Sequence, residues 1–164
     1  MPMTQRTTEP GQIVAKYIKT APVNVVALAN ELGIKVWESQ TLPPDKSGKI
    51  FKDPTNGGLS GFSIIVNARE APTRKRFTVA HELAHFLLHR QRLDKGELVD
   101  DTMYRSGMTT QEEAEANKLA VQILMPRELI KELMKSGSKD VESLARRLEV
   151  SVPAMKARLG VPLV

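Results

Sequence analysis

The pentapeptide at residues 81–85, His-Glu-Leu-Ala-His, constrains the fold of this chain more than any other part of its sequence. Two histidines four residues apart on a helix lie on the same face, where both can bind one zinc ion. The glutamate that follows the first histidine, Glu82, then lies beside the metal and can act as a general base toward water. The pattern therefore requires a helix through these residues and predicts hydrolysis at a metal centre.

The residues around the pentapeptide fit this helix. Pro72 and Thr73 open a segment that is expected to be helical from Arg74 to His89. A lone match to the histidine pattern often lies on a surface helix and binds nothing, but this match is surrounded by apolar residues at helical spacing. The residues that keep a 3.6-residue period are Phe77, Ala80, His81, Ala84, His85 and Leu88.

The composition narrows the type of site and the location of the protein. The 164 residues include no cysteine, so any zinc must be bound by histidine, aspartate or glutamate. No apolar run reaches the ~20 residues that span a bilayer, and the polar first ten residues lack the apolar stretch of a secretory signal. We therefore expect a cytoplasmic protein that does not contact a membrane.

The rest of the chain predicts an α+β fold, mostly helical with a small three-stranded sheet. Residues 1–9 are expected to form a flexible tail. Further helices are predicted at 11–20, 25–32, 110–124 and 127–135, and strands at 34–38, 49–52 and 59–66. Residues 91–110 are polar and read as irregular. Residues 137–164 have the spacing of a helix-turn-helix-like unit, which we expect to pack on a domain formed by residues 10–136.

A catalytic zinc site needs a third protein ligand, and two residues are candidates. His89 continues the spacing of the pentapeptide. Along a continuous helix, however, it lies about 12 Å from His81, whereas zinc–nitrogen bonds are only about 2 Å long. His89 is therefore expected to be an ordinary surface or partly packed histidine.

The better candidate is Glu113, on the predicted helix 110–124. It shares a face with Asn117 and Ala120 that is otherwise small and apolar, as a surface packed against the histidine helix would be. A buried glutamate needs a cation, and Asn117 could accept a hydrogen bond from a ligand histidine and fix its tautomer. Thr110 and Glu113 also match a capping box. The alternative is an ordinary run of solvated glutamates.

Three blocks of the sequence resemble the ImmA/IrrE metallo-endopeptidases: residues 76–89, residues 113–117 (Glu-Ala-Glu-Ala-Asn) and residues 123–126 (Ile-Leu-Met-Pro). The resemblance implies a zincin-like fold and a gluzincin-type site, with His81, His85 and Glu113 as zinc ligands and Glu82 as general base. It also implies a bacterial or phage-associated protein that cleaves or inactivates an Xre-type repressor and thereby derepresses mobile-element or stress genes.

Several features of a peptidase mechanism can be assigned from the sequence as hypotheses. An extended substrate would pair with the edge of the strand predicted at 59–66. Tyr104 and Arg105 could stabilise the oxyanion, or they are ordinary loop residues. A site of two histidines and one glutamate with open positions accepts Zn²⁺ or Mn²⁺.

The basic C-terminal unit supports a second class of function. The chain has a net charge of +5, and Arg146, Arg147, Lys156 and Arg158 could contact DNA phosphates. The same unit could instead hold the repressor. The alternative to a peptidase is therefore a DNA- or protein-binding regulator that inactivates a repressor by docking and contains a structural metal. The sequence leaves the oligomeric state open.

Overall fold

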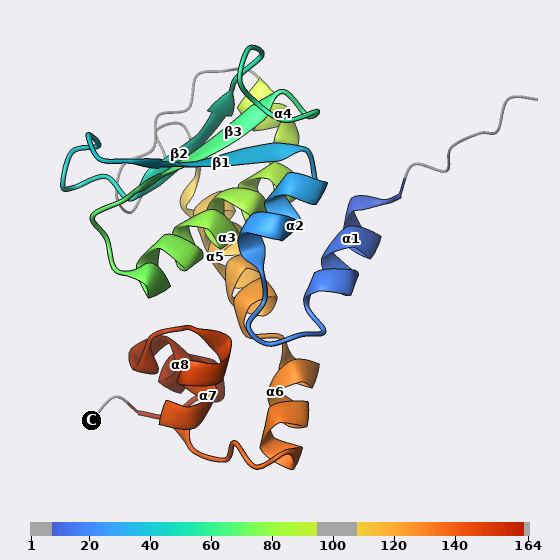
Figure 1. Ribbon diagram of the computed structural model, residues 1–164, viewed down its shortest axis with the longest axis vertical. Coiled ribbons are helices and arrows are strands. Elements are labelled where there is room, and N and C mark those ends of the chain that lie inside the picture. The colour runs from blue at the N-terminus through green and yellow to red at the C-terminus, as the bar shows by residue number, and fades with distance from the viewer. Residues whose placement is uncertain (1–7, 95–107, 163–164) are drawn as a thin grey trace, which may run out of the picture.

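The computed structural model describes residues 8–94 and 108–162. It has the mostly helical α+β fold with a three-stranded sheet that the sequence predicts (Figure 1). In chain order the elements are α1 (Pro10–Tyr17), α2 (Val25–Glu31), β1 (Ile34–Ser39), β2 (Gly48–Lys52), β3 (Phe62–Asn67), α3 (Pro72–Leu88), α4 (Arg90–Asp94), α5 (Thr110–Leu124), α6 (Arg127–Lys135), α7 (Val141–Leu148) and α8 (Val152–Leu159). None of these helices is long and apolar enough to cross a membrane.

The strand order of the sheet is β1-β3-β2, with β1 parallel and β2 antiparallel to β3. β3 is the central strand, and five of its six residues are buried because both of its edges are paired and a helix covers one face. The expectation that a substrate pairs along residues 59–66 is therefore wrong. Within the described part of the chain, the free edges belong to β1 and β2.

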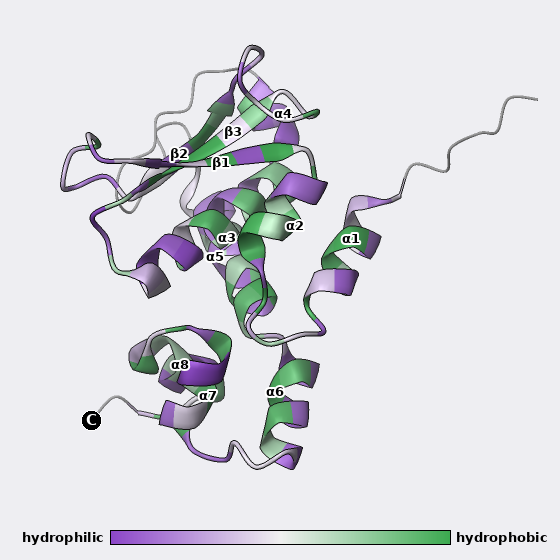
Figure 2. Cartoon of the chain, in the orientation of Figure 1, coloured by the Kyte–Doolittle hydropathy of each residue, from purple (hydrophilic) through white to green (hydrophobic). Residues whose placement is uncertain are grey.

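The helices α2 and α3 pack against the sheet, and α5 packs along α3 (Figure 1). Figure 2 shows hydrophobic residues on the sheet and on the helices that pack against it. The core between these layers contains Leu28, Ile64, Val79 and Leu83, all almost completely buried. This packing fixes the rotation of α3 and therefore the direction in which its histidines point.

A short helix follows α3 where the sequence predicts irregular structure. α3 ends at Leu88, and the carbonyl of its C-cap residue, His89, accepts hydrogen bonds from the backbone N–H groups of Arg92 and Leu93. Leu93 is buried, so its packing stabilises a turn of α4 that a polar sequence alone does not predict.

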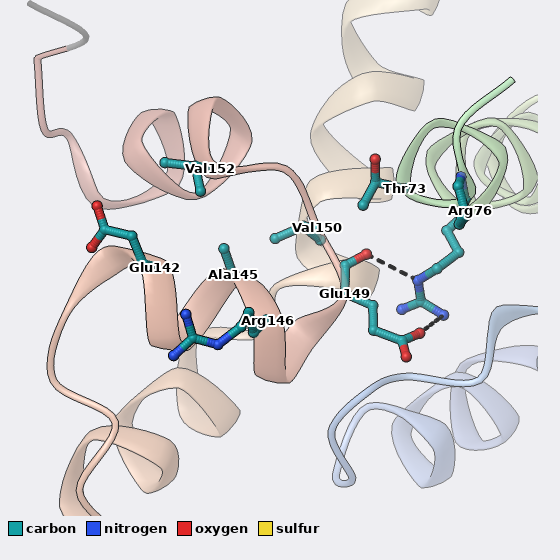
Figure 3. Close-up of a pocket in the computed structure, with 9 residues that line it drawn as sticks. Thr73, Arg76, Glu142, Ala145, Arg146, Glu149, Val150 and Val152 are labelled. Carbon is teal, nitrogen blue, oxygen red and sulfur yellow. Dashed lines mark hydrogen bonds and ion pairs between the residues drawn. The ribbon is translucent and has the colours of Figure 1, made fainter.

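The α7–α8 unit is attached to α3 by Arg76, which Figure 3 shows beside the turn between the two helices. Its Nε donates a hydrogen bond to the Glu149 carbonyl and its Nη2 donates one to the Leu148 carbonyl, both at 3.2 Å. Glu149 adopts a left-handed conformation (φ 51°) that ends α7, and its carboxylate lies 3.7 Å from Arg76. Arg76 therefore satisfies carbonyl groups that the end of α7 leaves without helical partners.

Beside Arg76 lies a hollow of about 700 Å³ between the start of α3 and the α7–α8 unit (Figure 3). Leu144, Leu148 and Met155 of the α7–α8 unit belong to the same hydrophobic core as Val79 and Ala80 of α3. The predicted division into residues 10–136 and 137–164 remains a prediction.

Candidate metal centre

The helix α3 brings the two histidines of the pentapeptide together. The Nε2 atoms of His81 and His85 lie 3.1 Å apart, and the two rings meet edge-on with centroids 4.7 Å apart. The ring of Phe77, one turn earlier, stacks against His81 with centroids 6.2 Å apart. His85 is completely buried. Both imidazoles are therefore held by packing with one nitrogen aimed at a common point.

Glu113 reaches the same point from α5. Its Oε2 lies 3.1 Å from Nε2 of His81, and its Oε1 lies 3.3 Å from Nε2 of His85. Zinc bonds of about 2.0 Å would place tetrahedral ligands about 3.3 Å apart. The distances between the two histidine nitrogens and from each of them to the Glu113 carboxylate are therefore close to this spacing, and the three side chains together could hold a metal ion.

The electrostatics of the site also suit a cation. Burial raises the pKa of the Glu113 carboxyl, but hydrogen bonds and positive charge from His81 and His85 lower it by more, so this pKa lies well below its usual range. The carboxylate is thus ionised although its residue is only 4% exposed. A buried anion beside two imidazole nitrogens is a donor set typical of zinc.

The start of α5 explains why Glu113 points toward α3. The Thr109 hydroxyl accepts a hydrogen bond from the Glu112 N–H, and the Glu112 carboxylate accepts one from the Thr109 N–H, both at 3.0 Å. The capping box is therefore one residue earlier than the predicted pair Thr110 and Glu113. Because Glu112 caps the helix, Glu113 is turned about 100° further round it. The face of α5 that carries Glu113 also carries Ala116, whose small side chain permits close approach to α3.

Asn117 lies on the exposed side of α5. The buried face of α5 passes through Ala116 and Ala120 rather than Asn117. This pattern of burial does not favour the expected contact between Asn117 and a ligand histidine, which stays a prediction.

Glu82 is completely buried and directly follows His81 on α3. It is not one of the three residues whose ligand atoms cluster, and its role as general base stays a prediction. Tyr104 and Arg105, the predicted oxyanion residues, lie outside the described residues.

The sequence interpretation missed the position of His89. His89 is outside the ligand cluster, as its distance along the helix predicts, yet it is 92% buried and its Nδ1 lies 2.9 Å from Nδ1 of His85. The spacing of four residues from His85 was the available signal, because such residues are neighbours on a helix.

Comparisons with known proteins show the family and the fold of this chain. The family model of the IrrE N-terminal-like domain, a peptidase family, matches residues 29–160. A transcriptional regulator from Mycobacterium tuberculosis has a similar structure, with a TM-score of 0.60 and 15% sequence identity. The match covers 94% of this chain and 46% of that chain, so this chain spans about half the length of the regulator. At this identity the likeness shows the fold alone. No curated protein matches the chain.

Proposed function

Because the chain belongs to the IrrE N-terminal-like peptidase family, we propose that it is a zinc-dependent endopeptidase that cleaves an Xre-type transcriptional repressor and thereby derepresses mobile-element or stress genes. The observation that carries the proposal is the cluster of ligand atoms from His81, His85 and Glu113. The two histidine Nε2 atoms lie 3.1 Å apart, and each faces one oxygen of the Glu113 carboxylate, at 3.1 and 3.3 Å. Structural zinc sites usually have four protein ligands, whereas catalytic sites have three.

Each residue of the proposed site has a separate role in hydrolysis. His81, His85 and Glu113 would hold Zn²⁺, with Mn²⁺ as the alternative metal. When bound, the metal supplies a Lewis acid that polarises the scissile carbonyl and makes water more acidic. Glu82 takes a proton from the attacking water and delivers it to the leaving amine as the peptide bond breaks.

The substrate would bind along β2 rather than β3. β2 is an edge strand, and it contacts α3, which carries the histidines, as well as α4. An extended peptide can add to such an edge through backbone hydrogen bonds. The other edge strand, β1, packs with α2 instead. Lys49 and Lys52 are exposed on β2, which favours a substrate segment with acidic side chains.

Tyr104 and Arg105 remain our candidates for stabilising the oxyanion of the transition state. Replacing one such donor is expected to lower kcat by about 100-fold while leaving the zinc content unchanged. Tyr104→Phe and Arg105→Ala should therefore be compared for kcat and for bound zinc. If both variants retain the parent kcat, neither residue has this role.

The proposal is tested by incubating the purified protein with the repressor encoded beside it, with and without a metal chelator. We expect cleavage only in the absence of chelator, and recovery of cleavage when zinc is added back. A repressor that stays intact under both conditions while forming a complex with the protein would favour inactivation by docking.

The second candidate function is DNA or protein binding by the α7–α8 unit. Two of its four basic residues already bind within the protein: Arg158 donates to the Met125 carbonyl at 3.0 Å, and Arg147 donates to the Ser138 hydroxyl at 3.4 Å. These contacts favour a protein-docking role over phosphate binding. Specific DNA binding would appear as a mobility shift that weakens steeply with salt, and retention of the shift in Arg146→Ala would argue against this unit as the DNA-binding element.

A further inference from the structure

We propose that His89 is a positioning residue that fixes the tautomer and ring orientation of the metal ligand His85, and that Glu115 holds His89 in place. The inference rests on the proposed metal site. Nδ1 of His89 lies 2.9 Å from Nδ1 of His85, and Nε2 of His89 lies 3.3 Å from Oε2 of Glu115. The His85 ring is completely buried and the His89 ring nearly so, so the contact between them is shielded from water.

The positions of the protons follow from this geometry. Nε2 of His85 faces His81 and Glu113 and is therefore the metal-binding nitrogen. A neutral imidazole that binds metal through Nε2 carries its proton on Nδ1. That proton is donated to Nδ1 of His89, which must then be unprotonated. The proton of a neutral His89 consequently lies on Nε2, where it is donated to Glu115.

This chain of hydrogen bonds, from His85 through His89 to Glu115, satisfies Nδ1 of His85 and both ring nitrogens of His89. It joins α3 to α5, the same two helices that supply the metal ligands. Partners of this kind orient metal-binding histidines and raise their basicity.

The other ligand histidine lacks an equivalent partner. Nδ1 of His81 is buried and has no hydrogen-bond partner among the described residues, and His81 is held instead by the stacked ring of Phe77. Hydrogen bonding therefore orients only one of the two histidines. Loss of His89 should accordingly have a larger effect on metal affinity than loss of a comparable residue elsewhere on α3 or α5.

The experiment measures zinc affinity by competition with a chromophoric chelator, in the full chain. His89→Leu retains an apolar side chain but removes the acceptor for the His85 proton. His89→Asn places a carbonyl oxygen close to the former position of Nδ1 and can still accept that proton. Lys118→Ala, an exposed change on α5, is the matched control. Thermal unfolding of each metal-free protein reports whether it folds.

We expect His89→Leu to weaken zinc binding by about 10- to 100-fold, His89→Asn to weaken it by less than about threefold, and the control to match the parent. If His89→Leu folds and binds zinc as tightly as the parent, or if the leucine and asparagine variants lose affinity equally, the inference is overturned while the proposed function stands. If the parent itself does not bind zinc, the proposed function fails as well.

A spectroscopic measurement on the parent protein does not depend on any variant folding. Long-range ¹H–¹⁵N correlation spectra of the zinc-loaded protein should show His85 protonated on Nδ1 and His89 protonated on Nε2. A His89 that is protonated on Nδ1 would overturn the inference, because its Nδ1 could not then accept the proton of His85.

Discussion

Replacing Ala116 by leucine should separate α5 from α3 and weaken the metal site without touching a ligand. Ala116 is completely buried and lies one turn from Glu113 on the face that meets α3. Ala80 and Ala84, on α3, are also completely buried. Small side chains on both helices therefore allow the close approach that brings Glu113 within 3.3 Å of the histidines.

The size of the effect follows from overpacking. Leucine adds three carbon atoms to a filled interface, and such additions cost about 1–3 kcal/mol. Leucine and alanine are both good helix formers, so helix propensity contributes little. A loss of about 2 kcal/mol would lower the melting temperature of a chain of this size by about 4–8 °C. A metal site must be held within about 0.5 Å, so we also expect zinc affinity to fall by at least about tenfold.

The assay compares Ala116→Leu with Ala114→Leu, the same change at an exposed position of α5. Thermal unfolding of the metal-free proteins measures stability, and chelator competition measures zinc affinity. The control should match the parent in both. If Ala116→Leu retains both the melting temperature and the zinc affinity of the parent, close packing of α5 on α3 does not position Glu113 and our reasoning is refuted.

Three further predictions concern stability. Arg76→Ala removes two hydrogen bonds to the carbonyls of Leu148 and Glu149 and should lower the free energy of unfolding by about 2 kcal/mol; an unchanged denaturant midpoint would contradict the assigned role. The hydrogen bond from the Thr109 N–H holds the pKa of Glu112 below its ordinary 4.5. The ionised Glu112 carboxylate therefore stabilises the fold fully at pH values above 4.5, and this stabilisation is lost as the pH falls through the lowered pKa. The stability difference between the parent and Glu112→Gln should therefore be present at neutral pH and vanish in acid; a difference that grows in acid would contradict this sign. Zinc at 100 times its dissociation constant should raise the free energy of unfolding of the parent by about 2.7 kcal/mol and should not stabilise Glu113→Ala, so equal stabilisation of both would exclude Glu113 as a ligand.

The fold class and the helices that carry the site could be predicted because strong local signals determine them. The apolar period around residues 77–88 predicts a helix whatever surrounds it, and α5 begins and ends close to the predicted bounds. The small, apolar surroundings of Glu113 likewise indicated that this carboxylate is buried.

The errors concern features that depend on tertiary structure. Two overlapping capping boxes, Thr109 with Glu112 and Thr110 with Glu113, match the same pattern, and only the packing of α5 decides between them. Ala116 and Asn117 are three and four residues after Glu113, so on a helix both lie near the face that carries Glu113. The sequence alone could not show which of the two faces α3.

The three-stranded sheet was predicted correctly, but the free edge expected at residues 59–66 and the environment of His89 were mispredicted for related reasons. A strand with a continuous apolar run is buried, but the sequence does not state whether other strands pair with both of its edges, as they do with β3. The distance between residues 81 and 89 along the helix correctly placed His89 outside the group of ligand atoms. That distance says nothing about contact between His89 and Nδ1 of His85, which depends on side-chain rotamers.

The most direct test of the central claim is the rate at which zinc-loaded Glu82→Gln cleaves the repressor. The substitution keeps the size of the side chain and leaves the three proposed ligands in place, so zinc content should equal that of the parent. Loss of the general base should lower the cleavage rate by about 10²–10⁴-fold. Cleavage by the zinc-loaded variant at the parent rate would contradict the proposed mechanism.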